Sequence, residues 1–191
     1  MNNPLEILRA LDAQLERPTE LTLFGRAAIA LGYPGAGDNF RRTEDVDVIF
    51  PTAQLEILGE DPSFWTAQDR VNEQLADRAL YLTHLFSELD IIIPADWMTR
   101  RVGIASSFKN LRLYRPATVD LIVTKMMRGD RQDLEDIQFL LEQEPISSDT
   151  LKTTFAKARV PELPELELIF QEAQPKVFAI ARAIEQNRTP R

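Results

Sequence analysis

The sequence predicts an α+β fold in which a small mixed sheet with flanking helices is followed by an all-helical C-terminal part. Segments with strand patterns alternate with helical patterns up to about residue 115, and only helical patterns follow. The chain has 191 residues, of which 44% are hydrophobic, and this is enough for a compact core. We therefore expect an α/β domain over 1–115 and a helical C-terminal domain over 116–191 that packs on it.

The α/β part opens with a helix. Apolar residues recur at helical spacing between Leu5 and Leu15, which predicts a helix over 4–17 that Pro18 ends. Further helices are expected at 27–31 and, as a pair, over 52–77, where Asp61-Pro62 starts the second. The expected strands are 21–24, 46–50, 80–85, 89–93 and, at an edge, 111–114.

The helical part is expected to contain four helices. Their predicted ranges are 116–128, 130–143, 148–158 and 163–186. The last of them has six apolar residues on one stripe, Leu166, Ile169, Phe170, Ala173, Val177 and Ile180. This stripe is expected to contact the core or another subunit.

Charge and composition exclude several kinds of site. The chain has 22 Lys+Arg against 30 Asp+Glu, a formal net charge of -8, which argues against a general nucleic-acid coat but not against a local basic pocket. It has no cysteine and one histidine, so disulfides, thiolate zinc sites and multi-histidine metal sites are excluded. A divalent metal would need carboxylate ligands, which favours Mg²⁺ or Mn²⁺. No signal-peptide pattern and no apolar run of about 18 residues is present, so we expect a cytoplasmic protein.

Two aspartates alternate with valines in the second predicted strand. Because side chains two apart on a strand share a face, Asp45 and Asp47 would project together. The simpler interpretation is a solvated strand face, but paired carboxylates repel each other unless a cation lies between them. Asp90, at the head of the predicted strand 89–93, is expected to be the third carboxylate, with Glu88 and Asp96 as rivals.

The segment before this pair predicts a phosphate-binding turn. Strand 21–24, then Gly25, then a helix of small residues forms a strand–turn–helix unit. Glycine allows a phosphate to approach the backbone, and the helix start offers free N–H groups. Arginines near this turn would add positive charge toward a triphosphate: Arg26, Arg41 and Arg42.

These residues resemble a known superfamily. Leu23-Phe24-Gly25-Arg26-Ala27-Ala28, a loop, and then Arg42-Thr43-Glu44-Asp45-Val46-Asp47-Val48 look like nucleotidyltransferases, closest to the bacterial abortive-infection and toxin–antitoxin branch. The later run from Lys125 to Ile137 is similar to a helix lysine and an acidic helix start that border the nucleotide cleft there. Arg26 in place of a small residue, and the long stretch before Asp45, depart from the family pattern.

The resemblance assigns a role to each matching position. It implies that Asp45, Asp47 and Asp90 bind metal and act in catalysis, with Asp90 helping to activate the acceptor hydroxyl. It implies nucleotide binding by Gly25, Lys125, Asp133 and Asp136, and the positive charge beside the turn adds Arg26 and Arg42 to the expected nucleotide-binding residues. A local alternative exists for Asp130 and Asp133 at the start of the predicted helix 130–143, where Asp130 is a plausible N-cap and Asp133 the third helical residue.

The expected function is a metal-dependent nucleotidyltransferase. It would move a nucleoside monophosphate from an NTP, with Mg²⁺ or Mn²⁺, to a hydroxyl acceptor on an RNA 3′ end or a protein. The resemblance also implies a toxin or phage-defence role with a cognate antitoxin-type protein as partner. Two alternatives are open: a catalytically inactive module that acts through protein partner binding, and a magnesium-dependent phosphohydrolase.

Overall fold

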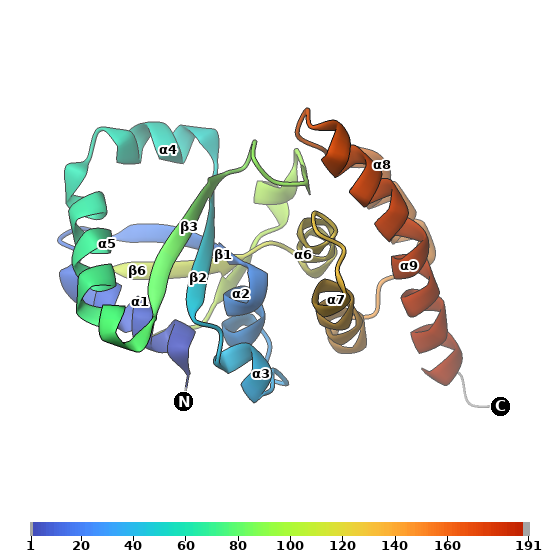
Figure 1. The fold of residues 1–191 in the computed structure, drawn as a ribbon, viewed down its shortest axis with the longest axis horizontal. Helices are drawn as coiled ribbons and strands as arrows, with labels where there is room; N and C mark the ends of the chain where they lie inside the picture. The colour runs from blue at the N-terminus through green and yellow to red at the C-terminus, as the bar shows by residue number, and fades with distance from the viewer. Residues whose placement is uncertain (1, 189–191) are drawn as a thin grey trace. The chain divides into compact units, whose positions relative to one another are not determined.

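The computed structural model describes residues 2–188, and the chain divides into two compact units (Figure 1). The first unit comprises Met1–Glu88 and Arg101–Arg115, and the second comprises Leu89–Arg100 and Pro116–Arg191. The sequence placed the segment 89–100 in the first domain, whereas the structure groups it with the helical unit.

A five-stranded mixed sheet forms the centre of the first unit, in the order β3-β2-β1-β6-β5. Its strands are β1 Thr19–Phe24, β2 Asp45–Phe50, β3 Tyr81–Ser87, β5 Val102–Ile104 and β6 Leu111–Arg115. β1 pairs antiparallel with β2 and parallel with β6, β2 pairs parallel with β3, and β5 pairs antiparallel with β6. The predicted α+β class with a small mixed sheet is confirmed.

Two helices of the first unit, α1 and α5, start at residues whose side chains cap them. Asn2 accepts a hydrogen bond from the Leu5 N–H at the start of α1, and Asp61 accepts one from the Ser63 N–H at the start of α5. The helices are α1 Asn3–Gln14, α2 Gly25–Gly32, α3 Asp38–Arg41, α4 Thr52–Gly59 and α5 Pro62–Leu75, followed by the 3₁₀ turn η1 Ala76–Arg78. The short helix α3 lies in a glycine-rich segment for which the sequence predicted a loop.

The two faces of the sheet differ in character. Val46 and Val48 on β2 are fully buried, and Phe50 on the same face packs edge-on against Phe64 of α5 with ring centres 5.9 Å apart. Asp45 and Asp47 alternate with the valines and therefore lie on the opposite face. The buried valine face forms the core beneath α5, and the aspartate face is half-exposed at these two positions.

The predicted strand 89–93 is wrong. Residues 88–91 form a turn and a bend, and only Ile93–Pro94 is extended, as the short strand β4. The turn is fixed because the Glu88 N–H donates to the Phe50 carbonyl over 2.9 Å and the Glu88 carboxylate accepts from the Thr52 N–H over 3.0 Å. The isoleucines that suggested a strand are at most 1% exposed, so they are buried without joining the large sheet. The strand beside β2 is β3, which the sequence predicted at 80–85.

The second unit is helical apart from one small strand pair. β4 pairs antiparallel with β7, Ala158–Arg159, and the 3₁₀ turn η2, Trp97–Arg100, follows β4. The helices are α6 Thr118–Lys125, α7 Arg131–Gln143, α8 Ser148–Lys157 and α9 Pro164–Arg188. The four predicted helices are confirmed, although α6 ends three residues earlier than predicted because the chain turns there toward Gly129, whose φ is +58°.

Candidate nucleotide and metal site

The acidic pair of β2 is held in an ordered position. Asp45 and Asp47 are both half-exposed on one face of the strand, between fully buried valines. The Thr43 hydroxyl donates a 2.7 Å hydrogen bond to Oδ1 of Asp45. A hydroxyl so placed orients the Asp45 carboxylate by donating to it.

Gly25 lies directly against the second aspartate. Its φ is +61°, a left-handed conformation that other residues rarely adopt. A β-carbon built on Gly25 would stand 2.5 Å from Oδ2 of Asp47, so only glycine permits this approach. The structure therefore brings together the predicted phosphate turn at Gly25 and the predicted metal ligand Asp47, which are 22 residues apart in the sequence.

The helix that starts at this turn has no side-chain cap from the residue before it. Phe24 stands at the N-cap position of α2 and makes no side-chain hydrogen bond to the first turn. Free N–H groups at a helix start attract anions such as phosphate. The turn is thus suited to bind an oxyanion next to the Asp47 carboxylate.

Arg26 and Arg42, the two arginines predicted to bind nucleotide, make different contacts. The Arg26 guanidinium carbon lies 5.5 Å from the centre of the Phe40 ring, a cation–π distance, so its side chain packs on α3. Arg42 follows α3 and lies 4.0 Å from the Asp38 carboxylate, in a contact that is largely exposed and therefore weak. Nucleotide binding by either arginine stays a prediction.

The third carboxylate is not where the strand prediction put it. Asp90 is exposed in the bend after β3 and belongs to the second unit. Both rivals have other contacts, because Glu88 accepts from Thr52 and Asp96 pairs with Arg100 over 2.7 Å. The backbone register places the Cα of His84 beside that of Asp47, although the histidine side chain lies outside what the structure describes.

The donor chemistry of the pair fits a hard divalent cation. Among the side chains that the structure describes, which leave out His84, no three His, Asp or Glu residues form a group that could hold a metal ion. Asp45 and Asp47 still supply carboxylate oxygens on one face, beside a glycine turn that a β-carbon would fill. Mg²⁺ is commonly held by one or two carboxylates together with substrate phosphates, so these two residues would hold it.

The structure brings three of the predicted nucleotide-binding residues into one buried ion cluster in the second unit. Lys125 on α6 donates to Asp133 over 3.1 Å and to Asp136 over 2.7 Å, and all three residues are at most 5% exposed. Arg128 donates two further bonds of 3.0 Å to Asp133. The cluster joins α6 to α7, so it has a structural role, and the nucleotide-binding role of these residues stays a prediction.

The charges in this cluster set the protonation of Asp133. Burial alone would raise the pKa of Asp133, but the hydrogen bond from Arg128 and the charges of Lys125 and Arg128 hold that pKa below its ordinary value. Asp130 is the N-cap, since it accepts the Asp133 N–H over 2.8 Å. The predicted capping role of Asp130 is confirmed.

One buried acid was missed by the sequence reasoning. Asp120 on α6 is 0% exposed, and Arg100 joins it over 2.8 Å to the more exposed Asp96. Its Oδ2 atom is buried and accepts no hydrogen bond from the part of the chain that the structure describes. Burial raises the pKa of Asp120 although the Arg100 hydrogen bond opposes this. An aspartate between apolar residues of a helix was the signal that could have found it.

Arg101, next in sequence, has a different set of contacts in the first unit. It donates over 2.6 Å to Glu20, and its guanidinium carbon lies 3.8 Å from the centre of the Tyr114 ring. From the sequence alone, Arg100 and Arg101, with Lys109, Arg112 and Arg115, would form a solvated cationic face, which could hold an RNA acceptor end if it bordered the acidic pair. Both arginines instead form ion pairs with acidic residues of their own units.

Comparison with models of protein families identifies the family of this chain. A sequence model of the family described as nucleotidyltransferase of unknown function (DUF6036) matches residues 5–169. No curated protein and no solved structure matches the chain. Across residues 2–188, no helix has the length and apolar character needed to cross a membrane. Because the match covers most of the chain and includes the β2 aspartates, Gly25 and the Lys125 cluster, the protein belongs to this family of nucleotidyltransferases.

Proposed function

We propose that the protein transfers a nucleoside monophosphate from an NTP to a hydroxyl acceptor. The observation that carries this proposal is the approach of Gly25 to Asp47, where a β-carbon would stand 2.5 Å from the carboxylate. A left-handed glycine, an uncapped helix start and a pair of carboxylates together fit a triphosphate that binds with a divalent cation.

The residues of the turn and of the acidic pair would have separate roles. The N–H groups at the start of α2 bind phosphate oxygens, and the absence of a side chain on Gly25 leaves room for them. Asp45 and Asp47 would hold Mg²⁺ or Mn²⁺, which supplies neutralisation of the charge that develops on the phosphates. Thr43 orients Asp45 through its 2.7 Å hydrogen bond.

The reaction is an in-line displacement at the α-phosphorus. The acceptor oxygen forms a bond to that phosphorus, the bond to the pyrophosphate oxygen breaks, and the acceptor proton leaves to a base. The family resemblance proposes Asp90 as the residue that aligns the hydroxyl and accepts this proton. Positioning and charge neutralisation provide most of the rate in this class of reaction.

The acceptor and the biological setting rest on the resemblance. We propose an RNA 3′ end or a protein hydroxyl as acceptor, and a toxin or phage-defence role with an antitoxin-type partner. These finer proposals do not alter the test of the chemistry, which needs only labelled nucleotide and a mixture of acceptors.

Label transfer tests the proposal. The protein is incubated with each α-labelled NTP, Mg²⁺ or Mn²⁺, and total RNA or total protein, and label in the polymer is counted. We expect transfer by the wild type and a loss of at least about 100-fold in Asp47→Asn, because the variant loses a ligand charge. Asp69→Asn, which changes an exposed aspartate of α5, is the matched control and should retain activity.

Nucleotide binding separates an inactive module from an enzyme whose acceptor is missing. NTP and Mg²⁺ together should raise the melting temperature of the wild type, and Asp47→Asn should lose this response. Full transfer by Asp47→Asn would refute the assigned site. Absence of both transfer and thermal stabilisation would instead support the module that acts through partner binding.

A further inference from the structure

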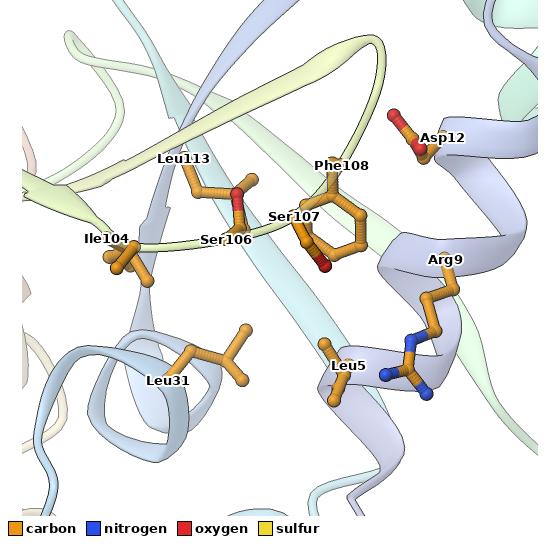
Figure 2. A pocket seen from close by; sticks show the side chains of 10 residues that line it. Leu5, Arg9, Asp12, Leu31, Ile104, Ser106, Ser107, Phe108 and Leu113 are labelled. Atoms are coloured by element: carbon orange, nitrogen blue, oxygen red, sulfur yellow. The ribbon is translucent and has the colours of Figure 1, made fainter.

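A hollow lies in the first unit, and none of its lining residues belongs to the acidic pair. It has a volume of about 590 Å³ and is lined by α1, α2, the strand residues Ile104 and Leu113, and the segment that joins β5 to β6 (Figure 2). This volume is within the range of about 300–1,000 Å³ that is usual for small-molecule sites.

The sheet register places this hollow on the face opposite the acidic pair. Leu113 pairs with Leu21 in parallel strands, so both side chains share a face. Leu23, two residues on from Leu21, pairs with Val48, and Val48 alternates with Asp47. A ligand in the hollow would therefore not occupy the nucleotide site.

The wall formed by α1 is one stripe of the helix. Leu5, Arg9 and Asp12 follow at spacings of four and three residues, so they line the hollow together. Asp12 has a structural task, because its carboxylate accepts the backbone N–H groups of Asn110 over 2.6 Å and Leu111 over 2.9 Å. It also accepts the Lys109 N–H over 3.0 Å, so it holds the β5–β6 segment against α1.

Arg9 has no such task. It is exposed, and in the described part of the chain no carboxylate forms an ion pair with it and no hydrogen bond from its side chain occurs. A guanidinium presents a planar set of donors that matches a carboxylate or a phosphate. The exposed hydroxyls of Ser106 and Ser107 add two more donors to the same hollow (Figure 2).

The remaining lining is apolar. Figure 2 shows Leu5, Leu31 and Phe108 around the hollow, contributed by α1, α2 and the β5–β6 segment. Leu113, which is 3% exposed, and Ile104, which is 9% exposed, form the part of the lining that comes from the sheet. Apolar surface of this kind is suited to a hydrocarbon or aromatic body, with the few polar groups fixing its orientation.

We propose that this hollow binds a small amphipathic anion, whose carboxylate or phosphate head pairs with Arg9 and whose apolar body lies on Leu31 and Phe108. The site is a binding site on the opposite face of the sheet from Gly25 and Asp47. It is independent of the proposed nucleotidyl transfer, since none of its residues belongs to that site.

Calorimetric titration of the full chain tests the proposal with four probes. Octanoate and octyl phosphate carry the two anionic heads, octylamine reverses the charge, and acetate removes the apolar body. We expect saturable 1:1 binding of at least one eight-carbon anion, and at least tenfold weaker binding of octylamine and of acetate. The tighter of the two anions identifies the head group.

Two variants assign the binding to this hollow. Arg9→Gln should weaken the anion at least about tenfold, because it removes a charged hydrogen-bond donor. Arg70→Gln, which changes an exposed arginine of α5 outside the hollow, is the matched control and should bind like the wild type. Absence of saturable binding by either anion, or equal affinity in Arg9→Gln and wild type, would overturn the proposal.

Discussion

A β-carbon on Gly25 would stand 2.5 Å from Oδ2 of Asp47, closer than β-carbons come to other atoms in real proteins. This contact ties the end of β1 and the start of α2 to the acidic pair of β2. Since β1 and β2 are antiparallel neighbours with Phe24 opposite Asp47, the sheet register itself sets the distance. The turn and the carboxylate form one unit, and a change in either should affect both stability and chemistry.

Gly25→Ala should therefore lower the free energy of unfolding and abolish transfer. An alanine at a φ of +61° costs about 1–2 kcal/mol in backbone energy, and its methyl group would displace the Asp47 carboxylate. Urea unfolding and label transfer measure the two effects. Gly59→Ala is the control, because Gly59 ends α4 and a β-carbon there meets no atom within 4 Å. Wild-type activity in Gly25→Ala would contradict the proposed phosphate turn.

Asp90→Asn tests the proposed role of Asp90 as the base. If Asp90 accepts the acceptor proton, the transfer rate should fall by about 100-fold or more, while stabilisation by NTP and Mg²⁺ is unchanged. A loss of transfer rate without a loss of stabilisation by NTP and Mg²⁺ would distinguish a base from a metal ligand. Asp77→Asn, at an exposed position of η1, is the matched control. Loss of nucleotide stabilisation in Asp90→Asn would show that the residue binds metal instead.

The sequence correctly predicted the strand that carries Asp47, but the strand that it predicted to start near Asp90 is wrong. Alternation of aspartate and valine is a local property of one strand, so it correctly placed Asp45 and Asp47 on one face. The run Ile91–Ile93 suggested a strand because apolar runs mark buried segments. Burial alone does not distinguish a strand from a buried irregular segment, and here most of the run is irregular.

The Lys125 cluster shows the limit of spacing arguments. The sequence correctly placed Lys125 on one helix and Asp133 with Asp136 on the next. It could not show that these side chains face each other, since that depends on how α6 packs on α7. Asp120 was missed for the same reason, because its partner Arg100 lies twenty residues away in the chain.

Lys125→Met should strongly destabilise the helical unit. The variant leaves Asp133 and Asp136, both 1% exposed, without their shared cation, and breaking a buried ion pair in this way costs about 3–5 kcal/mol. Arg128→Gln should cost less, because the Arg128 side chain is 64% exposed and Lys125 remains. Urea unfolding measures both, with Lys152→Met on the exposed side of α8 as control. A Lys125→Met variant as stable as the wild type would contradict a structural role for the cluster.

Asp120 should give the protein an unusual dependence of stability on pH. Burial raises its folded-state pKa above the ordinary value of 3.8, so between these two pKa values the folded protein binds more protons than the unfolded chain. The stability contributed by Asp120 is present below about pH 3.8 and is lost as the pH rises through the raised pKa. The free energy of unfolding of the wild type, measured relative to that of Asp120→Asn, should therefore decrease as the pH increases from about 4 toward neutrality.

Asp96, on the other side of Arg100, should behave in the opposite way. The hydrogen bond from Arg100 lowers the pKa of Asp96, so its contribution is present above about pH 3.8 and is lost as the pH falls through the lowered pKa. The effect should be small because the Asp96 side chain is 49% exposed. Urea unfolding of the wild type, Asp120→Asn and Asp96→Asn across this pH range gives the two slopes. If the stabilities of the wild type and Asp120→Asn depend on pH in the same way, the raised pKa of Asp120 is contradicted. If the stability differences from the wild type change with pH in opposite directions for Asp120→Asn and Asp96→Asn, then Arg100 pairs with a buried acid of raised pKa and an exposed acid of lowered pKa.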